Sequence, residues 1–481
     1  MTDDRNLLII MSDEHQARAM GCAGHPFVHT PNLDRMAERG MRFTNAYTPS
    51  PICVPARAAF ASGRYVHQNR LWDNAMPYVG EPKGWGHALQ AKGVPVESIG
   101  KLHYRHAEDP AGFDVEHIPM NVAGGVGMVW GSIRKKEERL NMPGRMLGDY
   151  IGPGESTYTE YDRAVVARTQ RWFRERAAVG GQQPWCLYVG LVAPHFPLVV
   201  PPEFLDLYPL DALPPVKLRP DDGYVRHPWI EVQNEMMDSE SKFHDETERL
   251  TAIAAYHGLC TWLDHSVGEI LSVLEDAGFS KNTTVVYTSD HGDNVGARGL
   301  WGKSNHYEES VAVPLIVASP DDQPGTCATP VSLLDLSETI LDHFDAALDG
   351  DRPGRSLYDI GWRDPEPDRV VLSEYHAVGA VTGAFMLRSG QWKYIHYVGF
   401  EPELFDLEAD PEETVNVASD PAYADVLAAR RAELAAICDP DEIDALAHAD
   451  QAALIAHHGG RERALKLGAP AATPPPKVAG P

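Results

Sequence analysis

Short apolar runs of strand length recur along this chain, and longer segments with helical spacing lie between them. Residues 6–11 (NLLIIM) form a continuous apolar run. Residues 185–197 (WCLYVGLVAPHFP) contain an apolar run that ends at His195, and residues 283–293 (TTVVYTSDHGD) contain a β-branched run that ends in Asp290 and His291. Such runs are typical of strands buried on both faces. Helical spacing is found at residues 159–178, 242–278 and 331–344. Strands that alternate with helices in this way predict an α/β fold with a large sheet flanked by helices.

The pattern changes at residues 351–368, a stretch rich in Pro and Asp that predicts a linker. Beyond it, VVLSEY, AFMLRSG and QWKYIHY predict three short strands, the last two joined in a hairpin at Ser389-Gly390, and helices then begin after Asp420 and Asp439. We therefore expect a large domain of residues 1–365 and an α+β subdomain with a short antiparallel sheet at 366–468. Residues 469–481 form a Pro/Ala-rich tail, expected to be loose or wrapped on a partner subunit.

Polar residues follow several of the predicted strands directly. Because the carboxyl ends of parallel strands meet at one edge of a sheet, we expect these side chains to converge. They are Asp13 and Glu14 after the first strand, Lys101 and His103 at the end of residues 94–103, His195 between two prolines, and Asp290 with His291 after residues 283–289. The carboxylates of Asp13, Glu14 and Asp290 and the imidazole of His291 could bind one cation. Three carboxylates and one imidazole favour Ca²⁺, Mn²⁺ or Mg²⁺ over zinc.

Residues 50–64 (SPICVPARAAFASGR) predict a helix that begins at a cysteine. Pro55 suits the first turn of a helix and Gly63 its end. Cys53 then lies at a helix N-terminus, where the dipole favours an anion or a thiolate, and Arg57 lies one turn further on. Taken alone, the same pattern also fits a buried cysteine and a surface arginine beside a helix start.

The pattern Cys-x-Pro-x-Arg at 53–57 resembles the signature of the type I sulfatases of the alkaline phosphatase superfamily, in which this cysteine is oxidised to formylglycine. The block at residues 29–57 is similar throughout to the start of bacterial sulfatases. A G-K-x-H element at 100–103, a P-H-x-P element at 194–197 and a GKxxxYE-like element at 302–308 follow in the family's order. The resemblance implies an alkaline phosphatase-like fold with a large mixed β-sheet, and it extends into the C-terminal subdomain.

This resemblance assigns roles to individual residues. It implies a divalent metal, with Ca²⁺ favoured over Mn²⁺ or Mg²⁺, and a hydrated formylglycine at residue 53 whose hydroxyl attacks sulfur. Two departures from the family pattern are Ala56, where many members have Ser, and Glu14, where many have Asp. The implied metal ligands are Asp13, Glu14, Asp290, His291 and the modified Cys53, and the implied catalytic and sulfate-binding residues are Cys53, Arg57, Lys101, His103, His195 and Lys303.

The substrate is less defined by the sequence. Asn74 and Trp72 in an aromatic loop, Trp130, and His306 are the residues that we expect to contact it. Absence of a recognisable leader favours a small aryl or alkyl sulfate over a polymer. A choline head would require aromatic faces and a carboxylate, for which Trp72, Trp130, Tyr375 and Glu374 are the candidate sources.

Composition restricts the kinds of molecule that we expect this chain to bind. A net charge of -27 argues against nucleic acid or an anionic membrane as a partner, so any anion site must be built locally. Six dispersed cysteines without a CxxC pair, an acidic N-terminus without a signal-peptide pattern, and no long apolar run favour a reduced, cytoplasmic protein. The expected partners are a small anionic sulfate ester, a formylglycine-generating enzyme during maturation and further copies of the chain in a homo-oligomer.

Four alternatives stay open at this point. The same residues suit a phosphonate monoester or phosphodiester hydrolase, since both substrates are tetrahedral anions. Choline-sulfatase specificity is the second alternative. The third is a non-catalytic protein that binds sulfate esters with an unconverted Cys53, and the fourth is a phosphatase-like enzyme that uses the Cys53 thiol itself.

Overall fold

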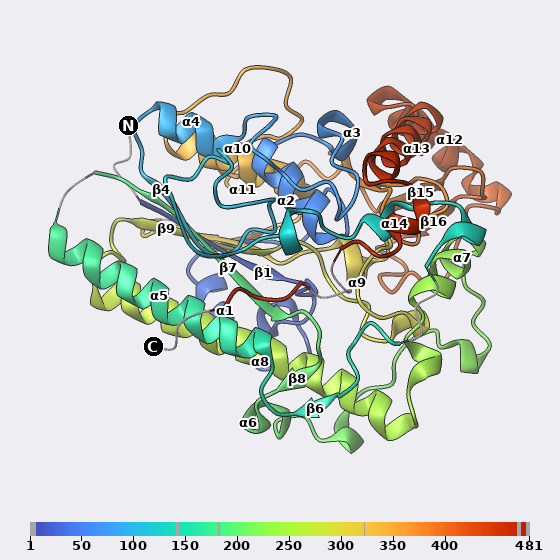
Figure 1. Cartoon of the computed structure of the whole chain (residues 1–481), viewed down its shortest axis with the longest axis horizontal. Coiled ribbons are helices and arrows are strands. Elements are labelled where there is room, and N and C mark those ends of the chain that lie inside the picture. Colours follow the sequence, from blue (N-terminus) through green and yellow to red (C-terminus); the bar gives the residue numbers. More distant parts are fainter. Residues whose placement is uncertain (1–5, 141–143, 181–182, 322, 469–472, 478–481) are drawn as a thin grey trace.

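An eight-stranded mixed sheet forms the centre of the computed structural model, which describes residues 6–140, 144–180, 183–321, 323–468 and 473–477 (Figure 1). Five neighbouring strands run parallel, and β10 lies antiparallel between β9 and β2. The strand order is β11 (Gly325–Cys327), β2 (Met41–Phe43), β10 (Leu315–Ala318), β9 (Thr283–Ser289), β1 (Asn6–Asp13), β7 (Cys186–Pro194), β4 (Val96–Lys101) and β5 (Val115–Met120). The mixed sheet predicted for the large domain is confirmed.

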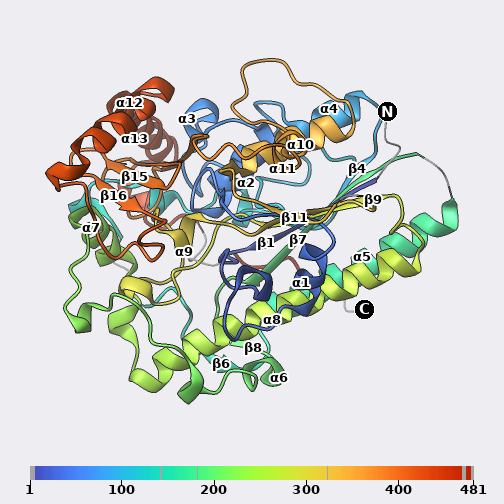
Figure 2. The ribbon, with the colours of Figure 1, turned by 180° about the vertical axis from the view of Figure 1, so that it is seen from behind.

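Helices cover both faces of this sheet because its strands bury apolar side chains on both sides (Figures 1 and 2). On β1, Leu8 and Ile10 join a core with α5 and α8, whereas Leu7, Ile9 and Met11 join a separate core on the opposite face. The first face carries α1 (Pro31–Ala37), α5 (Thr157–Val179) and α8 (Glu246–Asp276), and the second carries α2 (Cys53–Ser62), α4 (Trp85–Ala91), α10 (Leu333–His343) and α11 (Leu357–Gly361).

A second, four-stranded antiparallel sheet lies near the C-terminus, as the sequence predicts, with one strand more than the three expected. Its order is β13 (Val371–Tyr375), β14 (Ala384–Ser389), β15 (Trp392–Tyr397) and β16 (Glu403–Asp406), and Gly390 takes a φ of 59° in the predicted hairpin turn. Helices α12 (Ala424–Ile437) and α13 (Pro440–His457) lie beside this sheet (Figure 1). Other elements are β3 (Ala46–Tyr47), α3 (Val66–Asn69), β6 (Gly152–Pro153), β8 (Val199–Val200), α6 (Pro202–Leu205), α9 (Glu308–Val311), β12 (Val331–Ser332) and α14 (Arg461–Ala464).

Residues 107–158 lack a clear hydrophobic period and residues 201–238 are rich in proline, yet both segments contain regular structure. Residues 107–158 include β5, which forms an edge of the large sheet and is only partly buried, so it lacks the apolar run of a central strand. Residues 201–238 include α7 (Pro228–Met237), which begins at a proline and buries Trp229 and Ile230. Among the described residues, none of the helices combines the length and apolar character needed to span a membrane.

Candidate active site

Cys53 is the first residue of α2 and lies at the carboxyl edge of the large sheet. Its side chain is buried, with Sγ 3.2 Å from Nε2 of His291 and 3.7 Å from Oδ1 of Asp13. The loop before the helix is held by Ser304, whose N–H donates to the Pro51 carbonyl. The side-chain oxygen of Asn74 accepts the N–H of Val54 at the free amino end of α2. The helix start therefore holds residue 53 against the ends of β1 and β9.

Two carboxylates from distant parts of the chain meet at this point. Asp13 ends β1 and Asp290 follows β9, and both are fully buried. Strands β1 and β9 are parallel neighbours with Ser12 opposite Ser289, so the next residue of each strand reaches the same edge of the sheet. This pairing explains how residues 277 positions apart come together.

Arg57 pairs with both carboxylates and is 1% exposed. Its Nε donates to Asp290 at 2.8 Å and its Nη2 to Asp13 at 3.2 Å, while other guanidinium N–H groups donate to the Lys101 carbonyl and the Tyr188 hydroxyl. Arg57 is not among the residues that line the cavity above Cys53. The guanidinium therefore orients the carboxylates, and the structure does not place it where it would touch a substrate.

The ligand atoms of Asp13, Cys53, Asp290 and His291 all lie within 4.8 Å of one another, and all four residues are buried. Two carboxylates and one imidazole suit a hard divalent cation, so these residues fit the metal that the sequence predicts. Glu14 belongs to a second group, with Asp13 and His195. Of the five predicted ligands, Asp13, Asp290, His291 and Cys53 therefore lie in one group, and Glu14 lies in a neighbouring group that shares Asp13.

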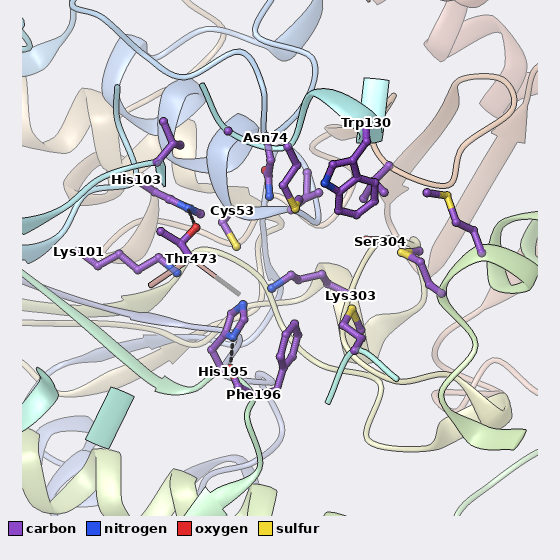
Figure 3. Close-up of a pocket in the computed structure, with 18 of the residues that line it drawn as sticks. Cys53, Asn74, Lys101, His103, Trp130, His195, Phe196, Lys303, Ser304 and Thr473 are labelled. Atoms are coloured by element: carbon purple, nitrogen blue, oxygen red, sulfur yellow. Dashed lines mark hydrogen bonds between the residues drawn. The ribbon is translucent and has the colours of Figure 1, made fainter. Parts of the chain in front are cut away.

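Lys101 and Lys303 bring positive charge to the two sides of Cys53 (Figure 3). The Lys101 ammonium pairs with Asp13, and the Lys303 ammonium pairs with Glu14 at 3.0 Å. Burial opposes the charge on Lys303, but Cys53 and the carboxylates around it outweigh burial and raise the pKa of its ammonium. Burial likewise opposes the charge of Asp13, yet the nearby cations, chiefly Lys101, hold the pKa of its carboxyl well below the usual range.

Two histidines complete the ring of groups around the cavity. His195 follows β7; its Nδ1 hydrogen-bonds the Phe196 carbonyl at 2.6 Å and its Nε2 lies 3.3 Å from Glu14. His103 follows β4 with a left-handed backbone, at a φ of 60°. Burial, reinforced by nearby lysines, holds the pKa of both imidazoles well below the usual range, so both rings are neutral at pH 7.

A comparison with known families decides what this arrangement is. The model of the family described as Sulfatase matches residues 5–346. The chain belongs to the sulfatase family. A second model, described as N-sulphoglucosamine sulphohydrolase, C-terminal, matches residues 296–439, which include the whole of the small sheet.

Relatives of this sulfatase support the same assignment over most of its length. A choline-sulfatase of Rhizobium meliloti (strain 1021) is 34% identical over 87% of this chain and 83% of its own. Arylsulfatase K of Danio rerio is 30% identical over 87% of this chain and 81% of its own. The fold is similar to that of a phosphonate monoester hydrolase of Agrobacterium radiobacter, with a TM-score of 0.72 at 21% identity, covering 90% and 95% of the two chains. The predicted family and enzyme class are therefore confirmed.

Burial, together with the charge of Asp13, raises the pKa of the unmodified Cys53 thiol to about 11 when the neighbouring carboxylates hold no metal. A divalent cation held by Asp13, Asp290 and His291 would favour the thiolate. The reactivity of an unmodified thiol at this position would therefore depend on the metal.

The outer part of the sulfatase cavity is mostly apolar. Asn74 and Trp130, both expected to contact substrate, line it (Figure 3). No Asp or Glu is among the described residues of this lining. Apart from the lysines and histidines, its walls include Met128, Met146, Phe196, Met236, Met237 and Val378.

Two other residues expected at the substrate lie elsewhere. Trp72 is fully buried and donates its indole N–H to Asp450 of α13 at 2.7 Å. His306 is buried, with its Nε2 facing the Ala384 carbonyl at 3.4 Å. The structure does not bring either residue to the cavity, because their side chains turn toward the C-terminal subdomain. Their aromatic character therefore reflects packing against that subdomain.

The carboxylate that choline recognition would require is also elsewhere. Glu374 is fully buried and pairs with His67 at 2.8 Å and His376 at 3.3 Å. The neighbouring Tyr375 donates its hydroxyl to the Val378 carbonyl at 2.6 Å. Neither side chain lines the cavity, so of the four aromatic and acidic candidates for a choline site only Trp130 does.

Several residues at the site carry no signal in the sequence. Asp293 accepts the N–H groups of Val295 and Gly302 and thereby shapes the loop that carries Lys303. The cavity methionines come from separate loops and from α7, and no spacing connects them. Thr473 of the C-terminal tail also lines the cavity, although the tail was expected to be loose or held by a partner. Residues 469–472 and 478–481 of that tail lie outside the described residues.

Proposed function

We propose that this sulfatase hydrolyses small organic sulfate monoesters with Cys53 oxidised to formylglycine and with one divalent metal. The observation that carries the proposal is that Sγ of Cys53 lies within 4 Å of both Asp13 and His291, in a cavity that Lys101 and Lys303 also line. A sulfate monoester is a permanent anion, and fixed cations stabilise the charge that develops on its oxygens.

Asp13, Asp290 and His291 would hold the metal, with Glu14 beside them. The metal would supply Lewis-acid polarisation of a sulfate oxygen, and formylglycine would supply a hydroxyl nucleophile together with an aldehyde that lets the sulfate leave. Ca²⁺ is our preferred ion, with Mn²⁺ or Mg²⁺ as alternatives, because oxygen ligands dominate the cluster. Maturation by a formylglycine-generating enzyme is part of the proposal.

The protonation states of Lys303, His195 and His103 suggest a different role for each in catalysis. Lys303 lines the cavity and is protonated, because the thiol and carboxylates around it raise its pKa, so we assign its ammonium to bind the leaving alcohol oxygen and stabilise the charge that develops there. His195 is neutral, and its Nδ1 is held by the Phe196 carbonyl, which leaves Nε2 facing the carboxylates. His103 is neutral as well; its Nε2 contacts the Thr473 hydroxyl, and its Nδ1, which has no hydrogen-bond partner among the described residues, is the atom that can accept a proton.

The apolar walls of the cavity indicate the kind of alcohol. A ring or alkyl chain packed against Trp130 and the methionines would gain free energy by leaving water. A quaternary ammonium would find the face of Trp130 but no carboxylate among the described residues of the lining. We therefore propose an aryl or apolar alkyl sulfate as the substrate, with choline sulfate as the second candidate in view of the choline-sulfatase relative.

A panel of five esters tests the substrate assignment. We expect kcat/KM for an aryl sulfate and for hexyl sulfate to exceed that for choline sulfate by about tenfold, which corresponds to burying one or two additional methylene groups. Both values should also exceed those for an aryl phosphonate monoester and an aryl phosphodiester. Faster hydrolysis of the phosphonate would establish the alternative activity, and fastest hydrolysis of choline sulfate would establish the second candidate.

Removal of the metal should lower stability as well as activity. Ligands that bind only the folded state stabilise it by mass action, so chelation should lower Tm by several degrees, on the order expected for a loss of about 3 kcal/mol. Differential scanning fluorimetry with EDTA, followed by addition of Ca²⁺, Mn²⁺ or Mg²⁺, measures the loss and identifies the ion. Asp290→Asn is the matched control, since it should make Tm insensitive to the chelator. An equal chelator effect in this variant would argue against a metal at Asp290.

Location and assembly complete the proposal. All six cysteines are free, which supports a reducing, cytoplasmic environment. Homo-oligomerisation stays a prediction, and measurement of the native mass would test it.

A further inference from the structure

The C-terminal end of the chain is attached to the rim of the active-site cavity. Ala464 at the end of α14 and the adjacent Leu465 and Leu467 pack in a small apolar cluster with Val129 and Ile133. Gly468 then lies against Gly127, which lines the cavity, and a Cβ on Gly468 would lie 2.0 Å from the Gly127 carbonyl oxygen. Only glycine permits this close approach at a φ of 102°.

Further along the tail, Thr473 lies inside the cavity itself. Its hydroxyl is 2.9 Å from Nε2 of His103, and it shares the cavity lining with Cys53 and Lys101 (Figure 3). The Tyr158 hydroxyl donates to the Thr473 carbonyl at 2.7 Å. Three prolines follow at 474–476, so the backbone loses little conformational freedom when it is held there.

The contact matters to His103 because that ring has few other restraints. His103 is 5% exposed, and within the described chain its Nδ1 has no hydrogen-bond partner. The Thr473 hydroxyl is therefore the group that fixes the rotation of this imidazole among the described residues. The Tyr158 ring also packs edge-on against His195, with centroids 5.7 Å apart. Thr473 thus contacts one active-site histidine directly and is connected to the other through Tyr158.

We propose that Thr473 is a positioning residue of the active site: its hydroxyl orients the His103 imidazole toward residue 53, and its carbonyl orients Tyr158 beside His195. The inference rests on the proposed sulfatase function and extends it to the C-terminal segment. The opposite reading, in which the segment is a plug that blocks substrate, makes the opposite prediction for the same variants.

Kinetics of single variants test the role of the hydroxyl. In Thr473→Val the side chain keeps its shape but loses the hydrogen bond, and we expect kcat to fall about tenfold while KM changes less than about threefold. Thr473→Ser restores the hydroxyl and should return kcat to within about twofold of the wild type. Thr326→Val, at an exposed position on the edge strand β11, is the matched control and should leave both constants unchanged. Peptide mass spectrometry should confirm equal formylglycine content in all of these proteins.

A double-mutant cycle tests the connection through Tyr158. Tyr158→Phe keeps the ring against His195 and removes only the hydroxyl that donates to Thr473. We expect a smaller loss of kcat than in Thr473→Val, and we expect the double variant to lose less than the product of the two single losses. Strictly multiplicative losses would show that the two residues act separately.

A measurement that needs no turnover separates this inference from the proposed function. Diethyl pyrocarbonate modifies neutral imidazole nitrogens, so loss of the Thr473 hydroxyl should increase carbethoxylation of His103 severalfold, as measured on the His103 peptide. Wild-type protein that hydrolyses no sulfate ester would overturn the proposed function, and the labelling would still test the contact. Unchanged kcat, higher kcat/KM or unchanged labelling in Thr473→Val would each overturn the positioning role.

Discussion

Replacement of Cys53 by alanine should abolish sulfate ester hydrolysis, with a fall in kcat/KM of at least about 10³-fold. The physical reason is that the side chain of residue 53 lies beside Asp13 and His291, in the cavity that Lys101 and Lys303 also line. Without it, the cations would still bind the ester, but no nucleophile would lie in line with the sulfur. Initial rates on the best ester of the panel measure the effect.

Cys53→Ser tests whether residue 53 is needed only to attack sulfur or also to release the sulfate afterwards. A serine hydroxyl can attack sulfur, but it has no second hydroxyl through which to expel the product. We therefore expect stoichiometric release of alcohol followed by arrest, with the sulfate retained on the protein and visible by mass spectrometry. Cys22→Ala is the control, because Cys22 is a half-buried cysteine outside the site and its removal should leave the rate unchanged. Full turnover by an unoxidised Cys53 would contradict the proposed role of formylglycine.

Replacement of Arg57 by methionine should destabilise the protein by about 3–5 kcal/mol, the usual cost of removing one partner of a buried ionic group. Asp13 and Asp290 would remain buried without the cation that bridges them. The Lys101 carbonyl and the Tyr188 hydroxyl would also lose a donor. Urea unfolding in the presence of EDTA measures the difference in free energy of unfolding without a contribution from bound metal.

The matched control for this variant is Arg171→Met. Arg171 also pairs with a carboxylate, Glu175, but its side chain is 74% exposed, so its loss should cost less than about 0.5 kcal/mol. Addition of Ca²⁺ should recover part of the stability of the Arg57 variant, because a cation between the carboxylates replaces some of the lost charge. A normal Tm together with a large rise in KM would instead indicate that Arg57 contacts the substrate.

The prediction for Cys53 depends on a local sequence motif, whereas the prediction for Arg57 depends on tertiary contacts. The position of Cys53 at a helix start follows from a local motif, and the sequence by itself determined it: Pro55 suits the first turn and Gly63 ends the helix whose first residue is the cysteine. The sequence also determined the large sheet, since apolar runs such as residues 6–11 must be buried on both faces. The polar residues that follow those runs then necessarily lie near one edge, and this is why the convergence of Asp13, Asp290 and Lys101 could be predicted from the sequence.

Only the tertiary structure decided which groups each side chain at that edge contacts. Spacing along a helix places Arg57 one turn from Cys53, but its guanidinium pairs with the buried carboxylates of Asp13 and Asp290 and does not line the cavity. Trp72 and His306 are adjacent in sequence to active-site loops, yet apolar burial turns both toward the C-terminal subdomain. Thr473 reaches His103 across 370 residues, a contact that no local pattern can encode because it depends on where the packing of Leu465 and Gly468 directs the end of the chain.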